Sequence, residues 1–115
     1  MDRIEDKIDR YQQLIEQLLI EYSKNDPIEE GVETQLVFDT ERHHYHWMNV
    51  GWDDLRHVHY SIVHFDIKDG KIWIQKNLTE ADPAEDLVEL GVAKEDIVLG
   101  LHPPYKRPYT DYGVA

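Results

Sequence analysis

The chain has 115 residues, of which 41% are hydrophobic, so it is long enough to bury the core of one domain and no more. Twenty-four acidic residues against twelve basic ones give a formal net charge of −12, which argues against direct binding to the phosphate backbone of a nucleic acid. The absence of cysteine excludes disulfides, thiolate metal sites and cysteine nucleophiles.

The amino-terminal segment, MDRIEDKIDRYQQ, is charged and lacks the apolar region of a signal peptide. No run of about 18 apolar residues is present, so we expect no segment that crosses a membrane. The sequence therefore indicates a cytoplasmic protein that folds as a single domain over residues 1–115.

The first predicted element is an amphipathic helix over residues 3–24, RIEDKIDRYQQLIEQLLIEYSK. Its apolar side chains recur at spacings of three and four residues, the pattern of a helix that packs one side on a core. They are Ile4, Ile8, Tyr11, Ile15, Leu18 and Tyr22, with Leu14 and Leu19 widening the stripe. Pro27 follows shortly afterwards, and because the residue before a proline resists helix, we expect the helix to end within SKNDP.

The next part of the chain changes to an apolar period of two, which predicts strands. Asp69-Gly70 is the strongest short signal for a hairpin, and Asp53-Asp54 is expected to turn the preceding pair. The predicted strands cover residues 33–41, 43–52, 56–68 and 71–77. Since each follows the last after a short connection, we expect a four-stranded antiparallel meander.

A short helix is predicted after the last of these strands. Asp82 is expected to cap it, Pro83 fits its first position and Glu85 completes a capping-box pattern. Gly91 suits the residue that follows the end of a helix. The sequence therefore predicts a helix that begins at Pro83 and ends before Gly91.

The remaining residues are expected to form a short strand and a strap. Residues 94–101, KEDIVLGL, indicate a turn and an apolar strand, and residues 102–115 are rich in proline and tyrosine. The predicted fold class is therefore α+β: an N-terminal amphipathic helix, a four-stranded antiparallel sheet, and a short C-terminal helix with a strand and strap.

Strict alternation along the predicted strands divides the apolar residues between both faces of the sheet. One face would carry Met48, Val50, Val63, Phe65, Ile67, Ile72 and Ile74. The other would carry Tyr45, Trp47, Val58, Tyr60, Ile62 and Trp73. The long helix covers one face, which leaves the second helix and the tail, or another chain, to cover the other. Exposed apolar area of this size marks an interface, so we expect a homodimer, a higher oligomer or a stable partner.

Histidine is concentrated in residues 41–60, ERHHYHWMNVGWDDLRHVHY, which hold five of the seven histidines. Alternation places four of them on one face, namely His44, His46, His57 and His59. Imidazoles bind Zn, Ni or Cu, so this face is a candidate metal site. The spacing is that of any two strands, however, and we favour a strand face near the sheet edge whose histidines pack by their rings, with no cofactor.

Motifs for catalysis are few. Asp66 and Lys68 match the end of the D-x-K pattern of nucleases, in which two carboxylates and a lysine hold Mg²⁺ and activate water. The sequence contains no nucleophile elbow, P-loop or G-x-G-x-x-G. We therefore expect no enzyme, and the alternative is a metal-dependent hydrolase or nuclease that uses the histidine face or Asp66 and Lys68.

Longer stretches carry a family resemblance. TQLVFDTERHHY is followed by VGWD, then by HFDIKDGKIWIQKNLTE, and then by AEDLVELGVAKEDIVLGLHPPYKRPYTDYGVA. In this order they resemble the XisI family, the fdxN element excision controlling factors of cyanobacteria, from the first helix to the last residue. The resemblance implies a small α+β protein around an antiparallel sheet. It also implies histidine at the positions of His44 and His64, with no requirement at the other histidines of the strand pair.

The resemblance further implies a role in developmentally timed excision of a DNA element, a controlled recombination in heterocyst differentiation. The family acts beside XisH, a partner that resembles restriction-endonuclease folds, while a separate recombinase performs the strand chemistry. No catalytic residue is implied.

We accordingly expect a non-enzymatic accessory or regulatory factor that binds an XisH-like protein. Residues 25–41 hold six acids and no base, and residues 79–96 hold seven acids and one base. These segments would shield a basic DNA-binding surface of the partner, as an antitoxin does. The expected contact residues are Trp47, Tyr60, Trp73, His102, Tyr105, Arg107 and Tyr109, although those of the tail equally suit a strap on the sheet.

Overall fold

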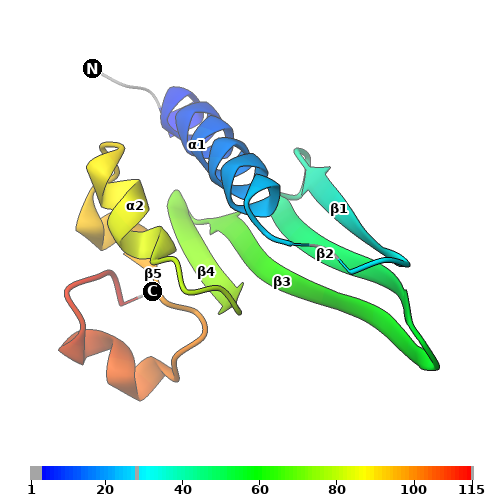
Figure 1. Ribbon diagram of the computed structural model, residues 1–115. Coiled ribbons are helices and arrows are strands. Elements are labelled where there is room, and N and C mark those ends of the chain that lie inside the picture. Colours follow the sequence, from blue (N-terminus) through cyan, green and yellow to red (C-terminus); the bar gives the residue numbers. More distant parts are fainter. Residues whose placement is uncertain (1–3, 28, 115) are drawn as a thin grey trace.

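The computed structural model describes residues 4–27 and 29–114 and shows two helices on a five-stranded sheet (Figure 1). The helices are α1 (Ile4–Lys24) and α2 (Pro83–Glu89), and two 3₁₀ turns are η1 (Lys94–Asp96) and η2 (Pro104–Tyr109). The strands are β1 (Val32–Asp39), β2 (His44–Asp53), β3 (Arg56–Lys68), β4 (Lys71–Asn77) and β5 (Ile97–Val98). They lie in the order β1-β2-β3-β4-β5, antiparallel except that β5 runs parallel to β4. The α+β class and the four antiparallel strands are confirmed, and β5 makes the sheet a mixed one.

Helix α1 packs the expected apolar stripe on the sheet. Tyr11, Ile15, Leu18 and Leu19 are all at most 7% exposed and belong to one core cluster with the sheet. The side chain of Ile4 lies outside the described residues. Among those residues, neither helix combines the length and the apolar character that a membrane crossing requires.

The two hairpin turns that the sequence predicts, between β2 and β3 and between β3 and β4, contain residues with positive φ. Asp69 and Gly70 have φ values of 55° and 74°, as the predicted turn of this type requires. The turn predicted at Asp53-Asp54 is wrong by one residue, because Asp53 pairs with Arg56 in the strands. Asp54 instead opens the loop with φ 54°, a conformation that aspartate adopts more readily than most residues.

A β-bulge in β3 decides which side chains share a face. Met48 of β2 pairs with Ser61, and the residue before it, Trp47, pairs with Val63. Ile62 has no partner in β2 and is therefore an extra residue in β3. An extra residue reverses the alternation of everything beyond it. The predicted division of apolar residues between two faces is therefore wrong. One face carries nearly all the large buried ones: Tyr45, Trp47, Val63, Phe65, Ile67, Ile72 and Ile74.

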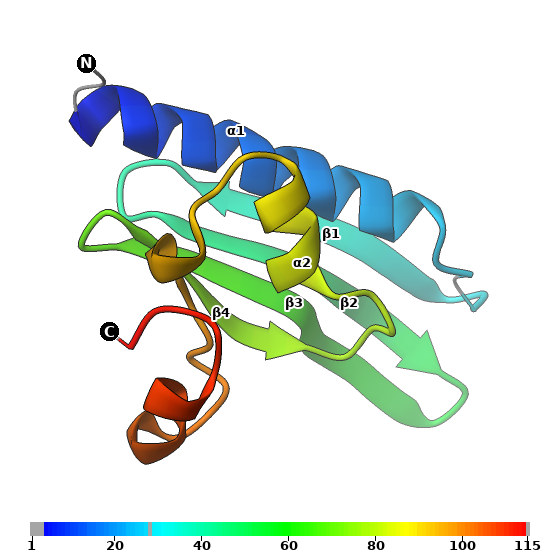
Figure 2. The same ribbon diagram turned by 90° about the vertical axis from the view of Figure 1, so that its left-hand side faces the viewer.

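Both helices cover this same apolar face (Figures 1 and 2). The Tyr22 hydroxyl of α1 donates a hydrogen bond to the Asp86 carboxylate of α2, and Leu87 is fully buried in the core that α1 helps to form. The expectation that the second helix would cover the opposite face is wrong, because the bulge brings Val63, Phe65 and Ile67 to the same face as Tyr45 and Trp47, and both helices pack there. Asp82 does cap α2, accepting a hydrogen bond from the Glu85 N–H at 3.2 Å, as predicted.

The carboxy-terminal tail is a strap at the β5 edge of the sheet. The Gly113 N–H donates to the Ile97 carbonyl at 2.8 Å, which ties the end of the tail to β5. The guanidinium of Arg107 lies 5.2 Å from the ring centre of Trp73 in β4, and Trp73 pairs with Asp66 of β3. The tail therefore reaches the face opposite the helices only beside β4, and the rest of that face is uncovered by the described chain (Figure 2).

Candidate functional site

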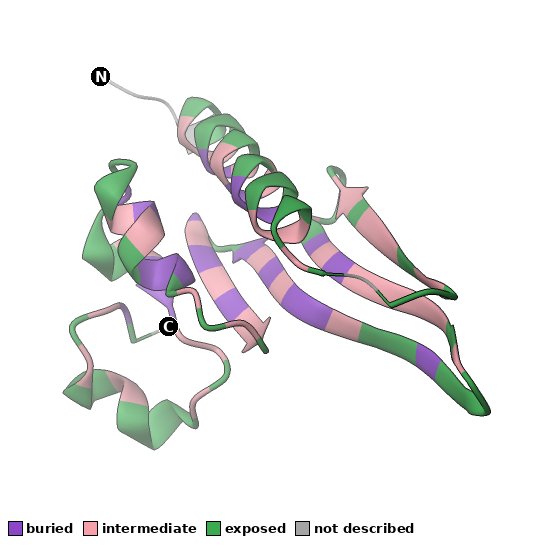
Figure 3. Cartoon of the chain, viewed as in Figure 1, coloured by how far each residue is buried: buried purple, intermediate pink, exposed green. Residues whose placement is uncertain are grey.

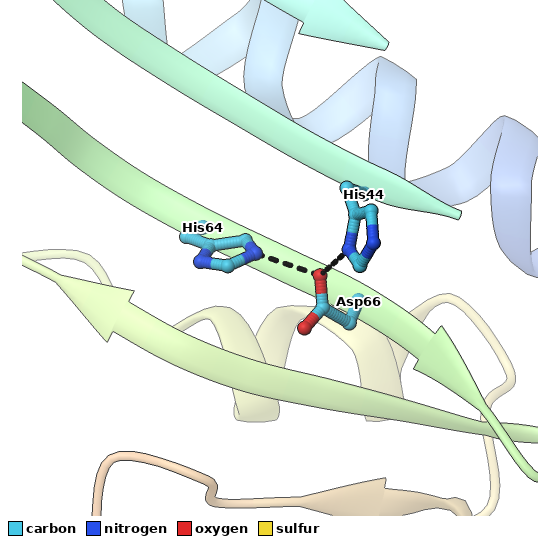
Figure 4. Close-up of side chains that lie close together, drawn as sticks. All are labelled: His44, His64 and Asp66. Atoms are coloured by element: carbon cyan, nitrogen blue, oxygen red, sulfur yellow. Dashed lines mark hydrogen bonds and ion pairs between the residues drawn. The ribbon is translucent and has the colours of Figure 1, made fainter. Parts of the chain in front are cut away.

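The open face of the sheet carries a compact cluster of His44 from β2 with His64 and Asp66 from β3 (Figure 4). The His44 Nδ1 lies 2.7 Å from Asp66 Oδ1, and the His64 Nε2 lies 2.6 Å from the same oxygen. Since a carboxylate can only accept, both imidazoles donate N–H groups to it. The Asp66 side chain is only 16% exposed, whereas that of His44 is 51% exposed.

A second layer of contacts holds the cluster in place. The Gln75 amide of β4 donates to Asp66 Oδ2 at 3.3 Å. The His46 ring stacks on the His64 ring with centres 3.8 Å apart. The Ser61 hydroxyl donates to the Val63 carbonyl at 3.2 Å, so it accepts from the His46 Nδ1–H at 3.0 Å. The cluster is therefore fixed by three strands before any ligand binds.

Electrostatics favour an ionised carboxylate at Asp66. Burial alone would raise the pKa of Asp66, but the hydrogen bonds from His44 and His64 and their charges outweigh it and lower the pKa below its ordinary value. Burial, together with the charge of His64, lowers the pKa of His46. At neutral pH the cluster thus offers the negative charge of Asp66, with the uncharged ring of His46 stacked beside it.

The structure divides the predicted histidine site. Nitrogen and oxygen ligand atoms of His44, His64 and Asp66 all lie within 4.8 Å of one another, and among the described residues no other group of three has this arrangement. His46 lies beside them as the stacking partner of His64. His57 and His59 are on the same face but near the hairpin tip, where their rings stack with centres 5.9 Å apart.

His64 escaped sequence reasoning because strict alternation places it on the opposite face from His44. The bulge at Ile62 brings it back, so that His46 and His64 pair directly. One signal for this was visible: Ile62 and Val63 are adjacent apolar residues that break the period of two.

The nuclease pattern of Asp66 and Lys68 is only half assembled. Both residues lie on the open face, but the Lys68 ammonium lies 5.1 Å from the ring centre of Trp73. Within the described chain, the only group of close ligand atoms contains one carboxylate, whereas the D-x-K chemistry uses two. This arrangement does not support a two-carboxylate magnesium site.

A groove of about 750 Å³ lies on the helix side of the sheet, past the end of α1. Tyr60, Val58 and Leu78 give it an apolar wall. Its acidic lining comes from two parts of the sequence: Asp26 and Glu29 follow α1, and Glu80 precedes α2. Among the described residues, Arg56 is the one base in the lining. Acids from both acidic segments, residues 25–41 and 79–96, therefore meet at one groove.

The seven expected contact residues do not form one surface. Trp47 is 1% exposed and packs in the core, and it also lines the groove, so it offers a partner little area of its own. Tyr60 is 42% exposed and lines the groove, whereas Trp73 lies half-buried on the open face. The other four lie in the tail, where Tyr105 and Tyr109 are 70% and 90% exposed and His102 and Arg107 are half-buried.

Comparisons with known proteins agree with the fold and with the sequence resemblance. The family model described as XisI protein matches residues 5–114. A XisI-like protein from Anabaena variabilis is 58% identical, with a TM-score of 0.90 over 94% of this chain and 99% of that one. The fdxN element excision controlling factor XisI from the same organism is 31% identical, with a TM-score of 0.86 over 96% of this chain and 100% of that one. No curated protein matches the chain.

The match of the family model to nearly the whole chain, with two solved structures of the same fold, confirms the resemblance seen in the sequence motifs. The chain therefore belongs to the XisI family.

Proposed function

We propose that this chain is a non-catalytic accessory factor that controls excision of a DNA element by binding a basic protein partner. The solved relative named as an excision controlling factor supports the biological role. The partner we propose is an XisH-like protein of nuclease fold, as the family resemblance implies.

The observation that carries this proposal is the groove where the two acidic segments meet. Asp26, Glu29 and Glu80 supply three acids around an apolar wall, which suits a partner segment with an apolar anchor and flanking lysine or arginine. Complementary charge of this kind speeds association and selects the partner. The same charge disfavours nucleic acid as the occupant, since phosphates would be repelled.

Self-association remains a separate proposal. The sequence predicts a homodimer because strict alternation puts apolar residues on both faces of the sheet. In the structure both helices cover the face that holds the buried core, so this reason no longer applies. Exposed aliphatic and aromatic side chains at the hairpin tip, Trp52 and Leu55, are 56% and 91% exposed and still offer a small contact area.

The test is co-expression with an XisH-like protein from the same genome, with a tag on one chain and size-exclusion chromatography with light scattering. We expect a stoichiometric complex that weakens as ionic strength rises. Light scattering of this chain alone then gives its own oligomeric state. A wild-type chain that never co-elutes with the partner would remove the proposal.

A charge-reversal pair locates the interface. Glu29→Lys with Glu80→Lys reverses two exposed groove acids, and we expect affinity to fall at least tenfold. Glu41→Lys with Glu95→Lys changes net charge equally, with one exposed acid from each acidic segment but outside the groove lining, and should bind normally. Equal loss in both double variants would show that total charge, and not the groove, drives binding.

A further inference from the structure

We propose that His44, His64 and Asp66 form a binding site for one divalent transition-metal ion of the zinc type. Imidazole nitrogen and carboxylate oxygen are the donors that Zn²⁺ and its neighbours in the first transition row accept. The proposal concerns the open face of the sheet and is independent of the acidic groove on the helix face.

The geometry of the three donors supports one ion. Their ligand atoms lie within 4.8 Å of one another. Ligand atoms around a tetrahedral zinc ion lie roughly 3.3–3.5 Å apart, given metal–ligand distances of about 2.0–2.2 Å. The ion would lie between Asp66 and the ring nitrogens that His44 and His64 now direct at its Oδ1, and each neutral ring would then carry its single proton on its other nitrogen. Binding requires the contacts from the two rings to Asp66 Oδ1, now 2.7 and 2.6 Å, to lengthen to this separation through rotation of the side chains.

Neighbouring side chains provide the support that metal ligands have in proteins. Gln75 holds the other oxygen of Asp66, and His46 stacks on the ring of His64 while Ser61 anchors His46. Such outer contacts fix ligand orientation and raise affinity. All three ligands also stand on strands, which hold them more rigidly than loops do.

The site would leave coordination positions open. Three protein ligands are the number found in zinc sites that also bind water or a substrate. Because His44 is 51% exposed and the face is uncovered there, the open positions would point to solvent or to a ligand atom of another molecule. Two neutral imidazoles and one carboxylate leave a bound divalent ion with a net positive charge, which suits an anionic or neutral oxygen ligand.

The test is titration of untagged, chelator-treated protein with Zn²⁺ by calorimetry, and with Co²⁺ followed by visible absorption. We expect saturation at one ion per chain and a rise in melting temperature, since the ion binds only the folded site. His44→Ala should weaken binding at least tenfold. Because the His44 side chain is 51% exposed, we expect this variant to keep its fold, so weaker binding would reflect the lost ligand. Asp66→Asn, which preserves shape, should remove the Co²⁺ band.

The matched controls are His57→Ala and His59→Ala, which remove exposed histidines from the same face outside the ligand group. Both should bind Zn²⁺ as the wild type does. The proposal is overturned if the wild type shows no saturable binding, or if His44→Ala binds normally. It is equally overturned if the controls lose binding, because the ion would then lie at the hairpin tip. In each of these cases the cluster has only a structural role, in which the Asp66 carboxylate accepts hydrogen bonds from His44 and His64.

Discussion

The two faces of this sheet are built from the same strands and yet have opposite characters. Buried residues alternate with more exposed ones along these strands (Figure 3). On the helix side, Tyr45, Val63 and Phe65 are completely buried. On the open side, their strand neighbours His44, His64 and Asp66 form a hydrogen-bonded cluster. Because side chains alternate along a strand, each core residue positions a site residue next to it. The contrast teaches that stability and chemistry can be changed separately in this protein by choosing the face.

The strongest test of this contrast is Phe65→Ala, which opens a cavity in the covered face. Phe65 is 0% exposed, so we expect a loss of about 3–5 kcal/mol in the free energy of unfolding. His59→Ala, at an exposed position on the open face, should change it by less than about 0.5 kcal/mol. Urea denaturation of both variants measures the difference, and similar losses would mean that the open face is also packed against something.

Two glycine substitutions test whether the chain is also tightly packed beyond the end of α1, where β1 pairs with β2. A Cβ on Gly51, which has φ +150°, would lie 2.1 Å from the Gly31 carbonyl oxygen. We expect Gly51→Ala to cost about 2–5 kcal/mol, from the clash and the unfavourable φ together.

Gly91 is the control for conformation alone. Its φ is +101°, but a Cβ there would meet nothing within 4 Å, so Gly91→Ala should cost only about 1–2 kcal/mol. Thermal unfolding separates the two variants. If they prove equally unstable, the strands have room to move apart, and the close approach of the two backbones is not a constraint.

The pH dependence of unfolding tests whether Asp66 on the open face is ionised in the folded protein. The folded pKa of Asp66 is lowered from 3.8, so its contribution to stability is present above that value and is lost as pH falls through the lower folded pKa. Asp66→Asn should cost about 1–3 kcal/mol at pH 7. It should also make stability less dependent on pH below about 4 than in the wild type. The residual dependence would include Asp96, whose pKa is also lowered. Unchanged pH dependence in the variant would contradict the ionised cluster.

The smallest effect is expected at the hairpin tip, beyond the cover of the helices. Leu55 is 91% exposed, so Leu55→Ala should change the free energy of unfolding by less than about 0.5 kcal/mol. If light scattering detects a dimer in the wild type and a monomer in this variant, the tip is the self-association surface. A measurable loss of stability in the monomer would instead show that the tip packs on the chain itself.

Most secondary structure could be predicted because its signals are local. The limits of β3 and β4 match the predicted residues 56–68 and 71–77, and Asp69-Gly70 adopts the turn that its residue types favour. Helix α1 follows from its apolar period, and Asp82 with Pro83 starts α2. In each case the interactions that stabilise the element lie between residues a few positions apart, so the sequence is sufficient to predict the element.

The candidate sites depended on contacts that no local pattern contains. Which face His64 and Asp66 occupy was decided by one extra residue, Ile62, in the pairing of β2 with β3. The sequence by itself determined the helices, the strands, the acidic character and the family resemblance, because these are properties of short segments. Only the tertiary structure decided the strand register, the single apolar face, the histidine–aspartate cluster and the meeting of two acidic segments at one groove. Those features arise from pairing between distant segments, where a shift of one residue exchanges the two faces.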